Sequence, residues 1–555
     1  MPQLYLSLKP TRALRICAAF LLVTLLGCGD ASDGSIPNAS AQRGFTTMDA
    51  GGGALESIEL PSLIALWKSQ DYTFEPVFTP TDALDKSVVW DSSDASVVAI
   101  EQNGTITAKA IGYANITATS ATNNAIQASV IVSVDREVAR VVSGGNHTVI
   151  LDSKGEVWVA GRNDCGQLGL GNRDNNSTFV KVKDLQSGVV SVAAGWEHTL
   201  AIDSKGDIWA VGCNDYGQLG SGDLNPRDSF ERITDKGDIV SVAAGAYHSI
   251  ALDDKGAIWT TGKNDSGQLG IGSGDSALFA QIPTVSSVTH IAAGNENTLA
   301  IDSASQAWIA GDNTYGQLGL GDENPVTLFS RISYIPNIAN AAFSAKSAYL
   351  LDANGNVWAS GYNGVGELGT GSVQYTENIF SIALSAFAFD AYAGYPYALE
   401  NIVDISAGRD RVLAVDSEGY LWTTKPRDDY FFLIDPDSDY YFKIMCDYYA
   451  HGYPVGFCNI KRTFDKVLNV SGVKRVAAGD FYALTLDENG SLWASGVNAY
   501  GQLGFGDAEF RFGFAKVPLP LLVICPEGQY LDEITNTCKS LATSIYFVNG
   551  VHNTE

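Results

Sequence analysis

Basic residues are scarce in this sequence. Its 555 residues include 35 Lys and Arg against 62 Asp and Glu, which gives a formal net charge of −27 at pH 7. A surface of this sign repels the phosphates of nucleic acids and of anionic lipids, so the composition argues against a nucleic acid partner. The same charge favours solubility.

Histidine is also rare, which limits acid–base chemistry. Of the six histidines, His147, His198 and His248 occupy equivalent positions in a repeated segment. A nucleophilic serine or cysteine needs a positioned base, and a residue that recurs with a repeat is more simply explained by folding. We therefore predict no catalytic residues. The repeated histidines are expected to be core or turn residues that hydrogen-bond within their own repeat.

Metal-binding patterns are equally weak. No cysteine has a metal-ligand spacing with a nearby histidine. Asp435-x-Asp437-x-Asp439 begins like a calcium loop, but Tyr440 stands where the sharp-turn glycine belongs and Cys446 where the bidentate glutamate belongs. The sequence therefore predicts no metal and no cofactor, with calcium at these aspartates as the alternative.

The apolar run from Ile16 to Leu26 follows three basic residues and is too short to span a membrane. This pattern is typical of a signal peptide. The run ends in Leu-Leu-Gly-Cys28, which resembles the lipobox of bacterial lipoproteins. The resemblance implies cleavage before Cys28 and attachment of lipid to it. An ordinary export signal with an incidental cysteine is the alternative.

The segment after this cysteine has little to bury. Residues 28–54 are rich in Ser, Ala, Asp and Gly, which predicts a flexible tether. With residues 1–27 as a lipoprotein signal peptide, we expect the protein to be exported and lipid-anchored to a bacterial membrane, at the outer membrane or the cell surface.

A tryptophan recurs through most of the chain at intervals of 49 to 71 residues. A period near fifty indicates a repeat architecture. Each copy reads as short apolar strands joined by tight turns, so one copy is one small antiparallel sheet. The repeated tryptophans, which we predict to be structural, are Trp158, Trp209, Trp259, Trp308, Trp358, Trp422 and Trp493.

The hairpin within each copy places large residues opposite small ones. If the hairpin of the second copy is centred on Lys205, Trp209 faces Ala201. An aspartate opens the hairpin in every copy and is expected to cap the turn. The Gly-x-Asn-x-x-Gly-Gln-Leu-Gly run reads as a crowded turn and not as a phosphate loop. The same offset pairs Ala251 with Trp259, Ala300 with Trp308 and Ala414 with Trp422.

These recurring residues resemble the regulator of chromosome condensation repeat family. Gly-x-x-His, the tryptophan and Gly-Gln-Leu-Gly recur in register over about 380 residues. The resemblance implies a seven-bladed β-propeller, placed at residues 137–521. Such propellers complete one blade with strands from both chain ends, so Phe514–Pro520 is the expected closing strand. The sixth copy lacks the glycine-rich turn.

Residues 55–136 have a different, alternating texture. Val-Val-Trp90-Asp-Ser-Ser, Asn103-Gly104 and Ala-Asn-Ile-Thr117 resemble the bacterial immunoglobulin-like domain, group 2. The resemblance implies a small β-sandwich with Trp90 in its core. Such modules space or adhere, and we favour the spacer. The predicted fold class is all-β: a seven-bladed propeller plus this immunoglobulin-like sandwich.

Two long spacings between copies indicate insertions at 372–403 and 425–470. The second is rich in aromatic and acidic residues, and exposed aromatics on a loop suit recognition. We predict partner binding there, with packing on the propeller flank as the alternative. The candidate binding residues are Tyr430, Phe431, Phe432, Tyr440 and Tyr441.

The eight cysteines fall into groups. An exported, oxidising setting predicts a disulfide between Cys446 and Cys458 and another between Cys525 and Cys538, the latter stapling a C-terminal tail at 522–555. Cys165 and Cys213 lie near the same turn of neighbouring copies but not at equivalent positions, so their pairing stays open.

Together these patterns predict a membrane-anchored, exported, non-enzymatic scaffold whose propeller binds a protein partner. Binding to polysaccharide or cell wall is the main alternative. The founding members of the family exchange guanine nucleotides on a nuclear GTPase, so exchange-factor activity is a distant alternative, as is an enzyme whose site is built from face loops. An exported, acidic lipoprotein does not suit the nuclear role.

Overall fold

The computed structural model describes only part of the chain, and every element in that part is a β-strand. None of the described residues forms a helix long and apolar enough to cross a membrane. Cys28 and the predicted tether to residue 52 lie outside the described residues. The described residues are 53–185, 188–233, 238–364, 366–372, 374–385, 397–409, 411–424, 464–524, 529–532 and 537–540.

The first strands build a sandwich around one core. A five-stranded sheet has the order β40-β2-β9-β8-β5, a three-stranded sheet has the order β3-β7-β6, and β1 pairs with β4. Trp90 is buried with Ile106 and Val132, which come from the two larger sheets. The prediction that Trp90 lies in the core is confirmed. The strands are β1 (Ser57–Glu59), β2 (Leu63–Trp67), β3 (Asp71–Thr73), β4 (Val77–Thr79), β5 (Val88–Ser92), β6 (Val98–Ile100), β7 (Thr105–Ala108), β8 (Gly112–Ser120), β9 (Gln127–Arg136) and β40 (Leu522–Ile524).

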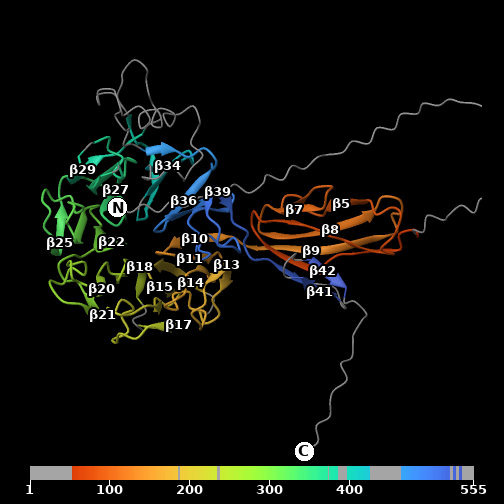
Figure 1. Ribbon diagram of the computed structural model, residues 1–555, viewed down its shortest axis with the longest axis horizontal. Coiled ribbons are helices and arrows are strands. Elements are labelled where there is room, and N and C mark those ends of the chain that lie inside the picture. Colours follow the sequence, from red (N-terminus) through yellow and green to blue (C-terminus); the bar gives the residue numbers. More distant parts are fainter. Residues whose placement is uncertain are drawn as a thin grey trace, which may run out of the picture. The chain divides into compact units, whose positions relative to one another are not determined.

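The repeats form antiparallel sheets arranged around a central axis, which makes this part of the chain a β-propeller (Figure 1). In six of the sheets four consecutive strands pair in order from the axis outward. The first three sheets are β10 (Val138–Ser143), β11 (His147–Asp152), β12 (Val157–Gly161) and β13 (Asn176–Lys181); β14 (Val189–Ala194), β15 (His198–Asp203), β16 (Ile208–Gly212) and β17 (Arg227–Arg232); β18 (Ile239–Ala244), β19 (His248–Asp253), β20 (Ile258–Gly262) and β21 (Ser276–Gln281). The next two are β22 (Val288–Ala293), β23 (Asn297–Asp302), β24 (Ala307–Gly311) and β25 (Val326–Ile332); β26 (Ile338–Phe343), β27 (Ser347–Asp352), β28 (Val357–Tyr362) and β29 (Thr376–Ile382). The last is β36 (Val473–Ala478), β37 (Tyr482–Asp487), β38 (Leu492–Gly496) and β39 (Arg511–Lys516).

The sixth sheet along the chain is larger because both expected insertions touch it. Its order is β31-β30-β35-β34-β33-β32. In the other copies the fourth strand from the axis follows the glycine-rich turn. In this sheet the fourth strand is β35, which follows the second insertion. Most of that insertion, residues 425–463, lies outside the described residues. The strands are β30 (Leu384–Ser385), β31 (Tyr397–Ala398), β32 (Ile402–Ala407), β33 (Val412–Asp416), β34 (Leu421–Thr424) and β35 (Phe464–Lys466).

The hairpin register confirms the predicted packing of large against small residues. Ala201 lies opposite Trp209, and the other three predicted pairs are also in register. The capping aspartate does more than close the turn. Asp203 Oδ1 accepts hydrogen bonds from two turn amides, while Oδ2 accepts one of 3.0 Å from Nε1 of Trp209. An indole–carboxylate bond of this kind recurs in every copy.

Neighbouring sheets are joined by contacts that repeat around the axis. The last glycine of each Gly-Gln-Leu-Gly turn faces the ring of a phenylalanine in the outer strand of the next sheet, as Gly169 faces Phe230. A side chain on that glycine would overlap the ring. Gly504 of the last sheet faces Phe179 of the first in the same way.

This contact replaces the closure that the sequence predicted. No propeller sheet in the described residues combines strands from both ends of the chain. Residues 514–516 do form an outer strand, but they belong to β39 of the last sheet. The following residues leave the propeller, and β40 pairs with β2 of the sandwich. The expectation of a shared closing blade is therefore wrong, because the inter-sheet contacts already join the last sheet to the first.

The sandwich and the propeller share a packed junction. Trp67 of β2 is buried, stacks edge-on against Trp158 at 5.2 Å, and donates a 2.8 Å hydrogen bond to the carbonyl of Pro520. The guanidinium of Arg136 lies about 5.5 Å from both indole rings and pairs with Glu156. Within the described unit, the two domains are therefore in direct contact.

Candidate binding face at the channel mouth

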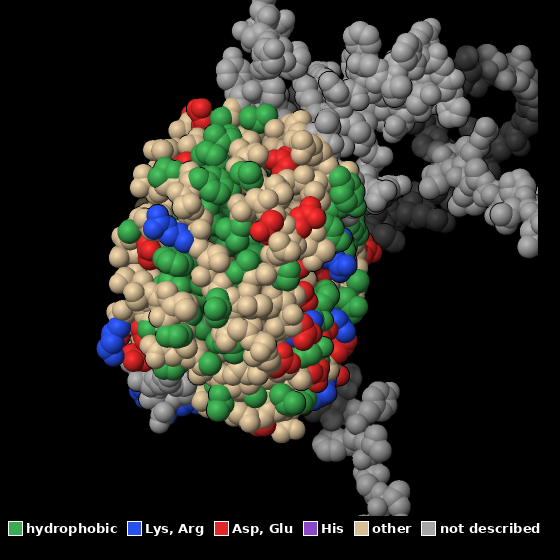
Figure 2. Space-filling view, turned by 90° about the vertical axis from the view of Figure 1, so that its left-hand side faces the viewer, with side chains coloured by type: hydrophobic (Ala, Val, Ile, Leu, Met, Phe, Trp, Pro, Cys, Tyr) green, Lys and Arg blue, Asp and Glu red, His purple; other side chains and the backbone are tan. Residues whose placement is uncertain are grey.

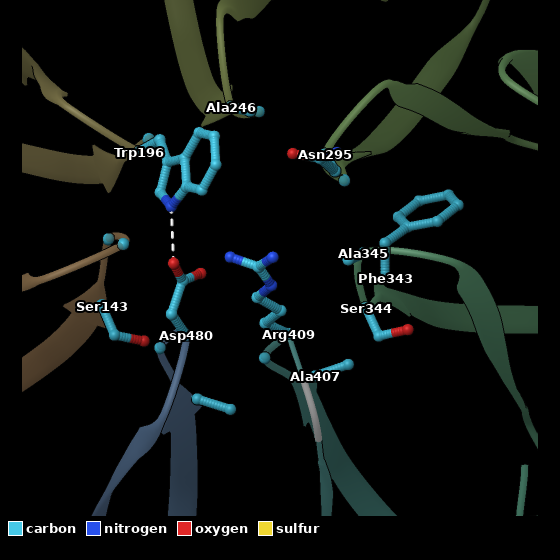
Figure 3. Close-up of a pocket in the computed structure, with 18 of the residues that line it drawn as sticks. Ser143, Trp196, Ala246, Asn295, Phe343, Ser344, Ala345, Ala407, Arg409 and Asp480 are labelled. Atoms are coloured by element: carbon cyan, nitrogen blue, oxygen red, sulfur yellow. Dashed lines mark hydrogen bonds between the residues drawn. The ribbon is translucent and has the colours of Figure 1, made fainter. Parts of the chain in front are cut away.

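The turns between the first and second strands of the sheets surround one end of the central channel. A cavity of about 280 Å³ opens there. Most of the residues that line it are small. They are mainly the glycine that opens each Gly-x-x-His or equivalent segment and the alanine just before it. Larger side chains enter from only a few of the turns, as Figure 3 shows for Trp196, Arg409, Phe343 and Asp480.

Trp196 and Asp480 bridge the second and the last sheet at this mouth. Nε1 of Trp196 donates a 2.6 Å hydrogen bond to the carboxylate of Asp480. The bond passes over Gly145 of the first sheet, where any side chain would overlap the indole. The turn of the first sheet therefore has to carry glycine so that Trp196 can reach across it.

A cation, Arg409, lies between two aromatic rings near this bridge. The guanidinium of Arg409 lies 6.0 Å from the ring of Trp196 and 5.6 Å from the ring of Phe481. In Figure 3 it projects into the middle of the pocket. Phe481 is 40% exposed. The mouth thus offers a cation and aromatic surface on a rigid ring of turns, a combination enriched at protein interfaces.

Two further aromatic clusters extend this face. Trp196 contacts Tyr247, which contacts Tyr216, and Lys263 lies over both tyrosine rings. On other sheets, Tyr362 contacts Tyr315 and Tyr375, with the ammonium of Lys346 4.6 Å and 5.0 Å from the rings of Tyr315 and Tyr362. The face therefore presents several cation–aromatic groups around the channel mouth.

The repeated histidines lie beneath this face and link the sheets. Nε2 of His147 lies 2.9 Å from the hydroxyl of Thr199 in the next sheet, and His198 and His248 make the same contact with Ser249 and Thr298. The expectation of bonds within one repeat is wrong, because each of these rings bonds a hydroxyl at the second position of the second strand in the following sheet. Burial lowers the pKa of these histidines to about 4, 3 and 4. They are therefore neutral at pH 7.

Sequence comparison bears on the same repeats. Residues 87–399, more than half of the chain, match the RCC1-like domain, and residues 473–502 match the regulator of chromosome condensation (RCC1) repeat. The chain belongs to the RCC1-like domain family. The match begins at residue 87, just before β5 of the sandwich, although the first propeller strand of this RCC1-like protein is β10.

Curated relatives match over short segments. The Ultraviolet-B receptor UVR8 of Arabidopsis thaliana is 37% identical over 101 residues, 18% of this chain and 23% of the receptor. The secretion-regulating guanine nucleotide exchange factor of Bos taurus is 34% identical over 84 residues, 15% of this chain and 18% of that protein. This RCC1-like chain therefore spans about a quarter or less of the length of these relatives.

Solved structures support the fold. Yeast RCC1 (Prp20), seen bound to Kap60, has a TM-score of 0.52 at 19% identity, covering 71% of this chain and 86% of that chain. Prp20p from Saccharomyces cerevisiae, described with its binding properties to Gsp1p and histones, gives 0.52 at 20% identity, covering 67% and 87%. Human WBSCR16 gives 0.53 at 17% identity, covering 66% and 95%. At these identities the likeness shows the RCC1 propeller fold alone.

One disulfide joins neighbouring sheets of the RCC1-like propeller. Cys165 and Cys213 are bonded, with their Cα atoms 5.1 Å apart. This answers the pairing that the sequence left open. Glu197 lies beside the bridge, 3.6 Å from Sγ of Cys213, and pairs with Arg162 at 2.7 Å. The bridge occupies the thiols that a metal would need at this trio.

The residues that the sequence predicted to bind a partner lie in a part of the chain that the structure does not describe, so that prediction stays open. Tyr430, Phe431, Phe432, Tyr440 and Tyr441 lie outside the described residues, as do Cys446, Cys458 and Cys525, and only the backbone of Cys538 is described, in β42 (Thr537–Ser540) paired with β41 (Gln529–Asp532). The seven repeat tryptophans are half-buried in their sheets.

Sequence reasoning missed Trp196, Arg409 and Asp480 as one group. Their common signal is position: each directly follows the glycine that opens Gly-x-x-His or the equivalent segment, where the other copies carry Gly145, Ala246, Asn295 and Ala345.

Proposed function

We propose that this RCC1-like protein is a scaffold that binds a protein partner through the face at its channel mouth. The observation that supports this most is the Trp196–Asp480 bridge with Arg409 beside it, at the centre of a face with further cation–aromatic groups. A related propeller, yeast RCC1 (Prp20), is described with protein partners: bound to Kap60 in one structure, and with its binding properties to Gsp1p and histones in another. We propose a binding role and not catalysis.

We also propose a blade count for the propeller, a role for the sandwich and a location for the protein. The six four-stranded sheets and the six-stranded sheet are seven blades of one closed ring, and the sandwich is a bacterial immunoglobulin-like spacer. The protein is exported and tethered to the membrane by lipid on Cys28. Cys28→Ala is expected to move the protein from the membrane fraction to the soluble exported fraction. Unchanged membrane fractionation of this variant would contradict the anchor.

The binding proposal is tested by crosslinking in intact cells, with the anchored full chain as bait and quantitative mass spectrometry of captured proteins. Arg409→Ala combined with Phe481→Ala removes the exposed cation and ring without touching the buried sheets. We expect this pair to lose at least about 2 kcal/mol of binding free energy, about thirtyfold in affinity, as for central interface residues. Phe512→Ala, an exposed aromatic of the outer strand β39, is the matched control.

The same experiment distinguishes the other candidate surface. A protein with residues 428–461 replaced by a short Gly-Ser linker, which spares β35 and the buried Phe464, is expected to keep partner capture if the mouth carries the binding. Loss of capture in that protein, with the Arg409/Phe481 variant unaffected, would place the site in the insertion and reject the channel mouth.

A polysaccharide ligand is the second candidate, favoured by the cluster of Tyr315, Tyr362 and Tyr375. Tyr375 is 63% exposed and packs edge-on against Tyr362, and an exposed aromatic ring offers an apolar face to a sugar. Tyr375→Ala is expected to reduce binding of the full chain to isolated cell-wall polysaccharide in a pull-down assay. Equal retention of wild type and variant would reject this candidate.

A further inference from the structure

The third position of each inner strand is polar in all the propeller sheets. It lies just after a register shift and pairs with an apolar residue of the second strand, as Arg140 pairs with Leu151 and Arg475 with Leu486. The residue that follows is always apolar and packs toward the sheets. The polar set is Arg140, Ser191, Ser241, His290, Asn340, Asp404 and Arg475.

These positions form a polar ring inside the central channel. Six of them, all except Ser191, line a cavity of about 720 Å³. Its wall continues into the mouth cavity through residues that line both, such as Ser143 and Phe343. A volume of this size is in the usual range for small-molecule sites.

Charge is concentrated on one arc of this ring. Arg475 of the last sheet and Arg140 of the first are neighbours, and Asp404 of the sixth sheet follows next to Arg475. Asp404 accepts a 3.2 Å hydrogen bond from the amide of Val476. Among the residues that the structure describes, neither arginine forms a salt bridge; Arg140 reaches only the hydroxyl of Ser191, at 3.5 Å.

Both arginines are exposed and line the channel cavity, so a ligand in the channel can reach their guanidinium groups. Desolvation lowers the pKa of Arg140, the charge of Asp404 opposes this effect, and the positive charge of Arg475 adds to it. The chain as a whole carries a charge of −27. The two arginines therefore make this arc of the channel locally positive inside an acidic protein, which favours the binding of an anion there.

We propose that the polar ring is a binding site for a small oxyanion, a carboxylate or a phosphate, held between Arg140 and Arg475. Guanidinium groups match both anions in bidentate geometry. His290 and Asn340 on the opposite arc offer further polar groups to the rest of the ligand. This site is separate from the partner-binding face and does not depend on it.

The test is calorimetric titration of the purified full chain with citrate and, separately, with inorganic pyrophosphate at constant ionic strength. We expect saturable binding of at least one of the two. Arg140→Gln with Arg475→Gln should weaken it by at least about tenfold, because the charge-assisted hydrogen bonds to the anion are lost. Binding of citrate alone would indicate a carboxylate ligand, and binding of pyrophosphate a phosphate.

Two further variants make the result specific. Arg173→Gln with Arg511→Gln changes the net charge equally at arginines that pair with Asp228 and Asp507, and should leave the affinity within about twofold. Asp404→Asn removes the one carboxylate of the ring and should tighten binding. If the double ring variant does not fold, Arg475→Gln alone replaces it. No saturable binding to wild type, or equal weakening by both arginine pairs, would overturn the proposal.

Discussion

The hydroxyl of Thr148 donates a 2.7 Å hydrogen bond to the backbone carbonyl of Gln502, 354 residues further along the chain. The equivalent hydroxyls of Thr199, Ser249 and Thr298 bond the corresponding glutamine of the preceding sheet. The joint between the last and first sheets is therefore built like the internal joints.

Breaking this bond should loosen the ring where no chain connects the sheets directly. Thr148→Val keeps the shape of the side chain but leaves the buried carbonyl of Gln502 without its partner, at an expected cost of about 1–3 kcal/mol. Thr199→Val removes the same bond at an internal joint and serves as the comparison. Thermal unfolding and limited proteolysis should show both losses, with faster cleavage in Thr148→Val. A Thr148 variant as stable and resistant as wild type would contradict closure at this joint.

The capping aspartate should matter more than its exposed neighbours. Asp253 accepts hydrogen bonds from two turn amides and from Nε1 of Trp259, at 3.0, 2.8 and 3.2 Å. Asp253→Ala is expected to cost about 2–4 kcal/mol in the free energy of unfolding, measured with denaturant. Asp254→Ala, at the next position in the same turn, should cost less than about 0.5 kcal/mol. Equal costs would show that the indole–carboxylate bond contributes nothing.

Acid should destabilise the propeller through its buried histidines. The unfolded chain binds protons on histidine near pH 6.5, whereas burial holds the folded-state pKa of His147, His198 and His248 at about 4, 3 and 4. The unfolded state therefore takes up more protons as the pH falls from 6.5 to 4, and stability falls by up to about 4 kcal/mol per pH unit for three sites. His198→Gln should reduce this slope by about a third in denaturant titrations. His290→Gln, in the channel, is the control, and an unchanged slope in His198→Gln would refute the assignment.

The carboxyl group of Asp404 should make the protein less stable as the pH rises, opposite to the effect of the histidines. Burial raises its pKa to about 6, against the lowering effects of the Val476 amide and the charges of Arg475 and Arg140. The folded state therefore favours the protonated acid, and this stability is lost as the pH rises from 4 through 6. Asp404→Asn should raise the melting temperature at pH 8 and leave it unchanged at pH 4. A lower melting temperature at pH 8 would show that the carboxylate stabilises the ring.

Reduction should loosen the first two sheets. The Cys165–Cys213 bridge closes a loop with a sequence separation of 48 residues, and a bridge of that length contributes about 2–4 kcal/mol. Cys165→Ser with Cys213→Ser should lower the melting temperature under oxidising conditions. The difference between wild type and variant should vanish in dithiothreitol, which also controls for the other cysteines. A persistent difference in reductant would mean that the serines, and not the lost bridge, are responsible.

Local patterns in the sequence predicted the sheets well. The opposition of Ala201 and Trp209 follows from a tight hairpin and an alternation of period two, both contained within ten residues. The bond from each tryptophan to its aspartate was not predicted, although the constant spacing of six residues between them was visible in every copy. The spacing alone does not show that the two side chains lie on the same face.

Contacts between repeats were not predictable in the same way. His147 bonds Thr199, 52 residues away, and no pattern within one copy selects that partner over one in its own sheet. The mouth group is harder still, since Trp196 and Asp480 are 284 residues apart. Their proximity follows only once the ring closes and Gly145 leaves room between them. Figure 2 shows one side of the molecule, where hydrophobic side chains are spread widely and acidic ones gather along part of the surface. Composition alone therefore does not single out one site.

The polar ring also shows how a symmetric scaffold acquires a polarised interior. Each inner strand repeats the same apolar positions, so the backbone is nearly the same from sheet to sheet. At the third position, however, the residues run from arginine through serine, histidine and asparagine to aspartate and back to arginine. The repeat supplies a set of equivalent sockets, and divergence at one socket per copy turns a rotationally uniform tube into a channel with a direction across its axis. An asymmetric ligand in it would therefore meet different chemical groups on its different sides.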